Sequence, residues 1–302
     1  MLTVSDGVVE GTREDRSGAA AQDALEGADY VILAVAIDRE KAWARDHEVA
    51  RRYGIAHYAE NGGPGAFAHT CRNLGLILPI VRDVEELCPD AYVLTLTNPL
   101  TRICSALNTA SSLRFVGFCH GIGIGYWIVA TALHRELGIE LPEDPRFLWR
   151  DERIRRMHEY QAIARERYSI RAAGINHFSW MLSVHDLETG EEVSSLLRHR
   201  LAELPPVFEP LTRRLADVLG LVPVQSDTHI SEYVPFASDA ETWTRFDIQL
   251  YDFEWATERR ERHDATLRSL ADGTASLDPA LAGHTERVEF VIDAMVNDRH
   301  GF

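Results

Sequence analysis

Residues 91–99 read Ala-Tyr-Val-Leu-Thr-Leu-Thr-Asn-Pro. Their apolar beginning is short and continuous, which is typical of a strand buried on both faces of a parallel sheet. Two further runs of this kind occur, at Tyr30–Ala36 and Arg114–Phe118, and helical patterns separate the three runs. This strand–helix alternation predicts right-handed crossovers and a doubly wound parallel α/β sheet.

Candidate chemical groups stand near the C-terminal ends of these strands. Asn98 follows the second strand, the pair Cys119-His120 follows the third, and a Gly/Pro-rich loop is predicted over residues 59–66. Because ligands bind beyond the C-terminal strand ends of α/β sheets, these positions predict a site.

The pattern changes after Gly121, so we expect two domains, residues 1–118 and an α+β domain over 119–302. A helix is predicted over Trp127–Leu137, and the arginine-rich stretch 141–168 is predicted to be a solvated helix pair. Two antiparallel strands are predicted at Ile170–Gly174 and Phe178–Asp186, and helices over 197–219, 253–270 and 285–296.

Composition excludes several classes of protein. The chain has 302 residues, 45% of them hydrophobic, and a net charge of -16. Such an acidic surface repels phosphate backbones, so no nucleic-acid partner is expected. No apolar run reaches the roughly 18 residues of a membrane span, and no signal peptide is visible. The four cysteines fit no CxxC pattern, which predicts reduced thiols and a cytoplasmic location.

Cys119 and His177 are candidate ligands of a divalent transition metal, since a thiolate and an imidazole leave coordination positions open for substrate oxygens. Each residue alone is more often structural. A cysteine nucleophile is a second interpretation. Cys119 and His120 are neighbours at a strand end and point in opposite directions, so His177 would be the base.

Other polar residues are weaker candidates when taken singly. Asn98 suits a ligand hydroxyl or a cofactor amide, although Asn-Pro also opens turns. Asp227 is a candidate acid or base, although an isolated loop aspartate is more often a solvated group or a helix cap. His229, Glu232 and Tyr233 form a polar cluster beside it.

Taken together, the motifs resemble glycoside hydrolase family 4. They occur in the order Gly27-Ala28-Asp29-Tyr30-Val31-Ile32, Gly63-Pro64-Gly65, Cys88-Pro89-Asp90-Ala91, Thr97-Asn98-Pro99, Gly117-Phe118-Cys119-His120-Gly121 and Gly174-Ile175-Asn176-His177. The resemblance covers nearly the whole chain and implies a Rossmann-like, lactate/malate-dehydrogenase-like fold.

The resemblance also implies a mechanism, one that departs from two-carboxylate glycosidase chemistry. NAD oxidises the sugar at C3, a base removes the C2 proton, the leaving group is eliminated, and water adds before the hydride returns. Manganese or a similar divalent metal polarises the sugar oxygens.

The same resemblance assigns roles to residues. It implies that Cys119 and His177 bind the metal and that Asn176 and His120 bind the sugar. Asn98 would bind both sugar and nicotinamide, and Pro99 would bind the cofactor. Asp227 is the implied base, with Tyr233 as the substitute, and His120 is also placed in the catalytic set.

The substrate is expected to be a small, unphosphorylated α-glucoside, α-galactoside or α-glucuronide. The resemblance implies that Cys-His-Gly at Cys119–Gly121 distinguishes such members from those acting on 6-phosphosugars. We also expect a homodimer or homotetramer, and an insertion over residues 141–168.

The chain also departs from the family. No Gly-x-Gly-Ser phosphate loop precedes Tyr30, and the chain is expected to be truncated at both ends. Residues 62–65 cannot replace the loop, because a proline removes an amide donor and no suitable strand precedes them. An inactive or fragmentary relative that still binds metal and sugar is therefore a second hypothesis, and an NAD-dependent hydroxy-acid dehydrogenase is a third.

Overall fold

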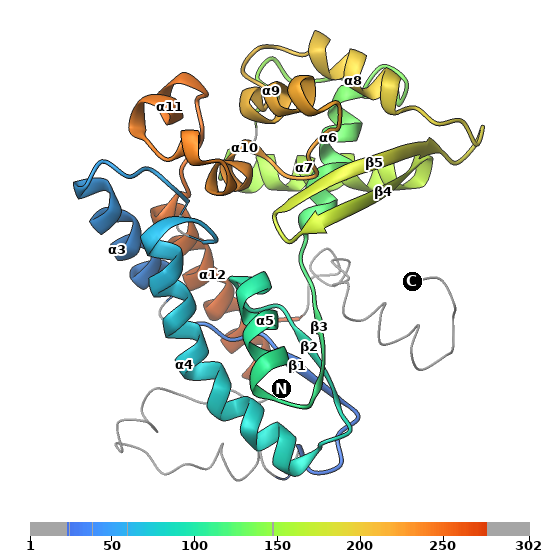
Figure 1. The fold of residues 1–302 in the computed structure, drawn as a ribbon. Coiled ribbons are helices and arrows are strands. Elements are labelled where there is room, and N and C mark those ends of the chain that lie inside the picture. Colours follow the sequence, from blue (N-terminus) through green and yellow to red (C-terminus); the bar gives the residue numbers. More distant parts are fainter. Residues whose placement is uncertain (1–22, 24, 38, 59, 147, 277–302) are drawn as a thin grey trace. The chain divides into compact units, whose positions relative to one another are not determined.

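Three parallel strands form the first sheet of the computed structural model, which describes residues 23, 25–37, 39–58, 60–146 and 148–276 (Figure 1). They are β1 (Tyr30–Leu33), β2 (Tyr92–Thr95) and β3 (Arg114–Gly117), in the order β1-β2-β3. Helices α4 (Gly63–Leu87) and α5 (Leu100–Ala110) lie between them in the chain, as the alternating pattern predicts. The predicted α/β class with a parallel sheet is confirmed.

The two faces of this sheet differ. Leu33 and Val93 are buried in one cluster with Ile77 and Val81 of α4 and Ile103 of α5. The opposite face brings Ile32, Leu94 and Val116 side by side in register. There Leu94 is completely buried, so β2 is covered on both faces as predicted, whereas Ile32 is 55% and Val116 38% exposed. The prediction that Tyr30–Ala36 is also covered on both faces is therefore wrong for its described residue Ile32.

The chain divides into two compact units. The described residues up to Ile37 and those of Thr70–Phe118 form the first, whereas Asp38–His69 and Cys119 onward form the second. Residues 38–69 therefore group with the second unit, although the sequence places them within the expected first domain.

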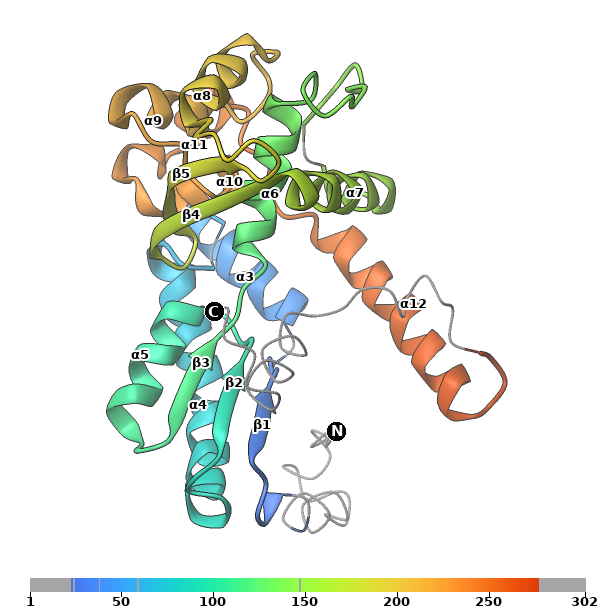
Figure 2. The same cartoon turned by 90° about the vertical axis from the view of Figure 1, so that its right-hand side faces the viewer.

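The second unit combines helices with an antiparallel hairpin (Figure 2). The hairpin strands β4 (Tyr168–Ile175) and β5 (Phe178–Asp186) confirm the predicted antiparallel pair. The helices of this unit, apart from the beginning of α4, are α3 (Arg39–Arg52), α6 (Gly121–Ala132), α7 (Asp151–Arg167), α8 (Ser194–Glu203), α9 (Pro210–Leu219), α10 (Asp227–Ile230), α11 (Ala240–Arg245) and α12 (Phe253–Ala271), with short 3-10 turns η1 (Ser231–Tyr233) and η2 (Pro235–Ala237).

Several predicted helix boundaries were wrong. Helix α4 begins at Gly63, inside the expected loop, because Pro64 is well suited to a first helical turn. The expected helix pair over 141–168 is a single helix, α7, preceded by irregular chain that contains Pro142 and Pro145. The expected helix over 197–219 is two helices, α8 and α9, and the expected helix over 285–296 lies outside the described residues.

Helix α6 begins six residues earlier than predicted, and its glycines explain the difference. Glycine is a poor helix former, yet a Cβ on Gly123 would lie 2.9 Å from the Gln161 side chain, and one on Gly125 3.0 Å from Val224. Close packing therefore requires these glycines and fixes the first turns of α6. Tertiary contacts override local propensity here.

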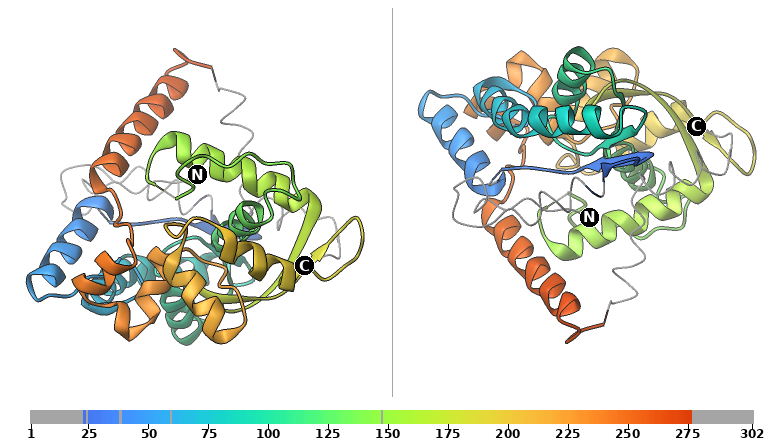
Figure 3. Two further views of the ribbon diagram at one scale, coloured as in Figure 1. Left: turned by 90° about the horizontal axis from the view of Figure 1, so that it is seen from above. Right: turned by 90° about the horizontal axis from the view of Figure 1, so that it is seen from below.

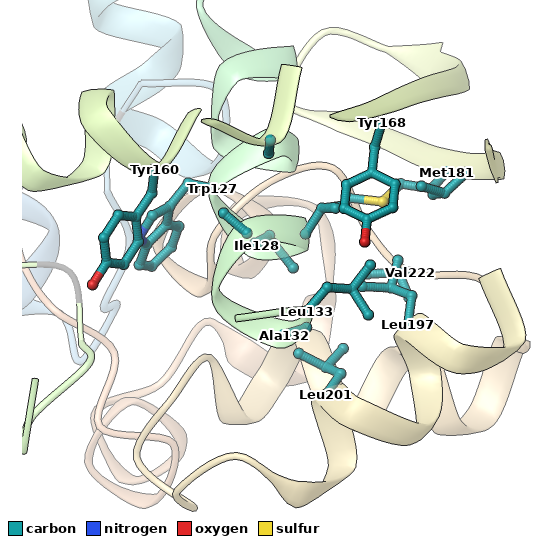
Figure 4. Close-up of a cluster of buried hydrophobic side chains, with 14 of the residues drawn as sticks. Trp127, Ile128, Ala132, Leu133, Tyr160, Tyr168, Met181, Leu197, Leu201 and Val222 are labelled. Carbon is teal, nitrogen blue, oxygen red and sulfur yellow. The ribbon is translucent and has the colours of Figure 1, made fainter. Parts of the chain in front are cut away.

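Helix α6 is the centre of the largest apolar cluster (Figure 4). Ile128, Val129 and Leu133 are completely buried. Around them Figure 4 shows side chains from the neighbouring elements: Tyr160 of α7, Tyr168 of β4, Met181 of β5, Leu197 and Leu201 of α8, and Val222. This cluster fixes the beginning of α6, where Cys119 lies.

A second cluster supports residues 227–234 and is rich in aromatic rings. Trp43 of α3 is almost fully buried, and its indole Nε1 donates to the Tyr58 carbonyl at 2.9 Å. Phe253, the first residue of α12, contacts Trp43 with ring centroids 5.6 Å apart. Beyond these contacts α12 extends as a long, mostly exposed helix (Figures 2 and 3). No helix in the described ranges is long and apolar enough to cross a membrane.

The buried imidazole of His47 makes stability depend on pH. Burial, then the neighbouring His57 and Arg51, lowers the pKa of His47 from 6.5 to about 4. As the pH falls below 6.5, the unfolded chain binds this proton before the folded chain does. The contribution of His47 to the free energy of unfolding is therefore fully present above pH 6.5 and is lost as the pH falls towards 4. We expect His47 to account for a loss of about 2–3 kcal/mol in the free energy of unfolding over this interval.

Urea titrations of the wild type and of His47→Gln at several pH values measure this effect. Glutamine does not titrate, whereas His57 stays in both proteins, so the difference isolates His47. Parallel pH profiles for the two proteins would contradict the expectation.

Candidate metal centre

Cys119 and His177, the two predicted metal ligands, lie together in the second unit. Cys119 stands two residues before α6, and His177 lies in the tight turn between β4 and β5. The Sγ of Cys119 is 3.1 Å from Nε2 of His177. The fold therefore brings together two side chains that are 58 residues apart in sequence.

The hairpin turn explains the Gly-Ile-Asn-His motif. His177 has a φ of +62°, a left-handed conformation that non-glycine residues seldom adopt outside turns. Gly174 has a φ of +142°, and a Cβ there would lie 2.4 Å from the Phe178 carbonyl oxygen. Glycine at position 174 thus permits the close strand pairing that aims the His177 ring at Cys119.

The electrostatics of this pair favour a thiolate facing an imidazolium in the absence of metal. Burial would raise the pKa of the Cys119 thiol, but hydrogen bonds from His177, Asn176 and the Gly121 N–H, with the charge on His177, lower it below its usual value. Burial would lower the pKa of His177, but Cys119 and Glu60 raise it to about 9. A thiolate is the form of cysteine that binds metals.

Glu60, Asn61 and His229 complete the cluster. Oε2 of Glu60 is 3.5 Å from Nδ1 of His177 and 3.7 Å from Nδ1 of His229. Nδ2 of Asn61 is 2.8 Å from Nδ1 of His177, and the rings of His177 and His229 stack with centroids 4.0 Å apart. Burial and the neighbouring His177 hold the pKa of His229 well below its usual value.

This donor set fits a divalent transition metal. Glu60, His177 and His229 each offer one ligand atom, all within 4.8 Å of one another. Sulfur, imidazole and carboxylate together suit manganese, iron, cobalt, nickel or zinc. Several buried polar atoms lack a hydrogen-bond partner among the described residues, and three of them belong to Asn176 (Oδ1), His229 (Nδ1) and Gln225 (Oε1) in this part of the second unit. Gln225 and Cys119 both lie close to Gly121. A Cβ added to Gly121 would be 2.1 Å from Gln225 Nε2 and 3.7 Å from Cys119 Sγ.

The segment that contains α10 and η1 holds two parts of the cluster. The Glu232 carboxylate accepts hydrogen bonds from the N–H groups of residues 60, 61 and 62 at 2.8–3.0 Å. The Tyr233 hydroxyl donates to the Asn176 carbonyl at 2.7 Å, and its ring stacks on Phe178. Burial and Glu60 raise the pKa of Glu232 to about 7, against the effect of the three N–H donors.

Asp227, the first candidate for the base, is 5% exposed and anchors α9. Its two carboxylate oxygens accept from the N–H groups of Leu211 and Thr212 at 2.8 and 2.6 Å. Its own N–H donates to the buried carboxylate of Glu209 at 2.6 Å. Burial raises the pKa of Asp227 to about 6, although the two backbone donors lower it.

The remaining site residues lie at the ends of strands. His120 is exposed and directly precedes α6. Asn98 and Pro99 follow β2 in the first unit, where a cis peptide joins them and the Asn73 side chain donates to the Asn98 carbonyl at 2.6 Å. The catalytic and binding roles of Asn98, Pro99, His120, Asn176, Asp227 and Tyr233 stay predictions.

Glu60 and Asn61 are members of the cluster that the sequence motifs did not predict. Both stand in the Gly/Pro-rich stretch, which was considered only as a phosphate loop, and Gly62 N–H is bonded to Glu232 instead. The available signal was a carboxylate and an amide directly before the pair Gly62-Gly63, since glycines permit close backbone approach. His229 and Glu232 were noted only as polar neighbours of Asp227.

Comparisons with known proteins show which proteins this chain is similar to. The sequence pattern of "Family 4 glycosyl hydrolase" matches residues 14–134, and that of "Family 4 glycosyl hydrolase C-terminal domain" matches residues 172–301. The α-glucosidase of Erwinia rhapontici is 31% identical over 239 residues, which are 78% of this chain and 41% of that protein. The α-galactosidase of Bacillus subtilis is 27% identical over 70% of this chain and 43% of its own length.

A solved structure shares the fold. A 6-phospho-α-glucosidase from gut microorganisms, solved with NAD and Mn²⁺, matches 93% of this chain and 60% of its own chain with a TM-score of 0.63 and 16% identity. The chain thus spans about half the length of the relatives it matches.

Since both matching patterns describe glycosyl hydrolases, the hydroxy-acid dehydrogenase interpretation loses its support. The chain belongs to glycosyl hydrolase family 4.

Proposed function

We propose that this protein hydrolyses an unphosphorylated α-glycoside, an α-glucoside, α-galactoside or α-glucuronide, with the help of NAD and a divalent metal such as manganese. The observation that carries the proposal is the buried cluster of Cys119, His177, Glu60 and His229. The α-glucosidase and α-galactosidase relatives support an unphosphorylated substrate.

Cys119 and Nε2 of His177 would hold the metal, with Glu60 beside Nδ1, the other ring nitrogen of His177, and His229 beside Glu60. Bound there, the metal would act as a Lewis acid towards the oxygens on C2 and C3 of the sugar. The unpartnered Asn176 Oδ1 and Gln225 Oε1 are available to orient sugar hydroxyls as acceptors. His120 is exposed at the beginning of α6 and would contact the sugar.

We assign removal of the C2 proton to Tyr233. Its hydroxyl lies 2.7 Å from the carbonyl of Asn176, the residue next to His177. Asp227, the other candidate, has both carboxylate oxygens occupied by N–H groups of α9. A phenol is a weak base at neutral pH, so this role depends on positive charge nearby that lowers its pKa.

Asn98 and Pro99 would contact the nicotinamide. They follow β2 at the C-terminal edge of the parallel sheet, where α/β sheets bind ligands. NAD, when bound, would accept a hydride from sugar C3 and return it. Within the described ranges, no glycine loop joins β1 to a following helix, so these residues account only for the nicotinamide end of the cofactor.

The proposal is tested with aryl α-glycosides that do or do not carry a 6-phosphate. Each substrate is assayed with and without NAD and with and without Mn²⁺. We expect turnover of the unphosphorylated substrates only when both additions are present, with solvent deuterium entering at C2 of the sugar. Turnover without NAD, or only of the 6-phosphates, would overturn it. Manganese and sugar binding without turnover would favour the inactive-relative hypothesis.

We further propose that the protein is cytoplasmic and forms a homodimer or homotetramer. Light scattering would measure the mass of this assembly.

A further inference from the structure

Glu232 binds the loop that carries Glu60. Its carboxylate accepts three consecutive backbone N–H groups, from Glu60 at 2.8 Å, Asn61 at 2.9 Å and Gly62 at 3.0 Å. Consecutive N–H groups that converge in this way form a concave anion-binding site. Here the anion is supplied by the chain itself, from a residue about 170 positions away.

The fit between this loop and Glu232 is close. A Cβ on Gly62 would lie 2.5 Å from the Glu232 carbonyl oxygen and 2.8 Å from its Cβ, so no other residue is accommodated without a shift. A Cβ on Gly63 would lie 2.4 Å from the His57 ring. The loop therefore approaches η1 as closely as a glycine backbone allows, and its N–H groups are aimed at a single carboxylate.

The conformation of this loop fixes two side chains of the metal centre. Glu60 lies between His177 and His229, and Asn61 contacts Nδ1 of His177. Neither side chain would keep this position if the backbone of residues 60–62 rotated. The next residue of η1, Tyr233, donates to the Asn176 carbonyl. The short segment Glu232-Tyr233 therefore binds two backbone stretches near His177: residues 60–62 and Asn176.

We propose that Glu232 is a positioning residue for the metal centre, which acts by holding Glu60 and Asn61 against His177. This inference rests on the proposed function, since it takes the cluster to be the metal site. Glu232 itself uses its carboxylate on backbone N–H groups and acts on the metal through Glu60. Removal of a hydrogen-bonding partner of a metal ligand commonly lowers metal affinity by about 10–100-fold.

The test measures Mn²⁺ affinity by titration calorimetry in Glu232→Gln. All three N–H groups donate to Oε1 of Glu232, and the Asn61 N–H also reaches Oε2. Glutamine has nearly the same shape, but its neutral amide oxygen accepts these hydrogen bonds more weakly than a carboxylate does, and its NH₂ group takes the place of Oε2. We expect Mn²⁺ affinity to fall about 10–100-fold with an unchanged far-ultraviolet circular dichroism spectrum. The matched control is Glu192→Gln, in which the altered carboxylate accepts from the Ser194 N–H at 3.0 Å away from this cluster. It should bind Mn²⁺ as the wild type does.

A double-mutant cycle with Glu60→Gln separates positioning from general support of the fold. If Glu232 acts through Glu60, the Glu232→Gln change should have little further effect on Mn²⁺ affinity in the Glu60→Gln protein. Additive losses would overturn the inference, and so would equal affinities of Glu232→Gln and the wild type. Should Glu232→Gln fail to fold, Gly62→Ala disturbs the same contact from the other side and should weaken Mn²⁺ binding in the same way.

Hydrogen exchange at the amides of residues 60–62, measured without metal, separates this inference from the proposed function. Exchange there should be at least tenfold faster in Glu232→Gln and unchanged in Glu192→Gln. A wild type that does not bind Mn²⁺ would overturn the proposed metal site, and the exchange rates would then decide the role of Glu232. Unchanged exchange in Glu232→Gln would overturn that role.

Discussion

Replacement of Cys119 by serine should lower the affinity of this protein for Mn²⁺ by at least about 100-fold, which is the upper end of the range for residues that act on a metal only indirectly. Hydrogen bonds from His177, Asn176 and the Gly121 N–H lower the pKa of the Cys119 thiol and so favour the thiolate. A serine hydroxyl stays protonated in the same place. It therefore offers the metal neither a negative charge nor a soft sulfur donor.

Titration calorimetry measures the affinity, and Co²⁺ provides a second readout. The sulfur-to-cobalt charge-transfer absorption of the wild type should be absent from Cys119→Ser. Cys71, an exposed free cysteine on α4, gives the matched control, because Cys71→Ser should leave both readouts unchanged. Mn²⁺ affinities of Cys119→Ser and the wild type that agree within twofold would show that Cys119 is no ligand.

Replacement of Asp227 by alanine should lower the free energy of unfolding by about 3 kcal/mol, because the variant leaves two buried N–H groups of α9 without acceptors, each worth about 1–3 kcal/mol. The Glu209 carboxyl also loses a neighbour. Burial, followed by the charge of Asp227, holds the pKa of Glu209 well above its usual value. The alanine variant also removes the side-chain hydrogen bond between Glu209 and Asp227, which adds to the loss.

Urea denaturation measures the change. The comparison is Asp239→Ala, which removes an exposed N-cap that accepts from the Thr242 N–H at 2.8 Å. That variant should cost only about 1 kcal/mol. Equal losses in the two proteins would contradict a structural role for Asp227. A stable Asp227→Asn protein without turnover would return the role of base to this residue.

The sequence predicted the parts of the fold that depend on local patterns. Three apolar runs gave the parallel strands, and the two runs around Asn176-His177 gave the hairpin. Cys119 and His177 were found because each stands where a strand ends. Helix α6 was placed too late, because the residues that pack against Gly123 and Gly125, Gln161 and Val224, are far away in sequence.

Sequence patterns could not predict the role of Glu60 for a similar reason. Its neighbours His177, His229 and Glu232 are all more than 100 residues away, and no local periodicity records such contacts. The exposure of Ile32 on β1 was also missed, since the run Tyr30–Ala36 is equally apolar whether one or both of its faces are covered. What covers a strand is decided by other parts of the chain.

The bond between the 60–62 loop and Glu232 also sets an order of events during synthesis. About 170 residues separate the partners, so a ribosome that adds roughly 5–20 residues per second makes Glu60 about 10–30 s before Glu232. During that interval the nascent chain lacks the Glu232 carboxylate that accepts from the three N–H groups in the folded protein. The metal centre is therefore assembled late, after β4, β5 and α6 have been made, and a pause in translation before residue 232 would prolong the exposure of an open glycine loop.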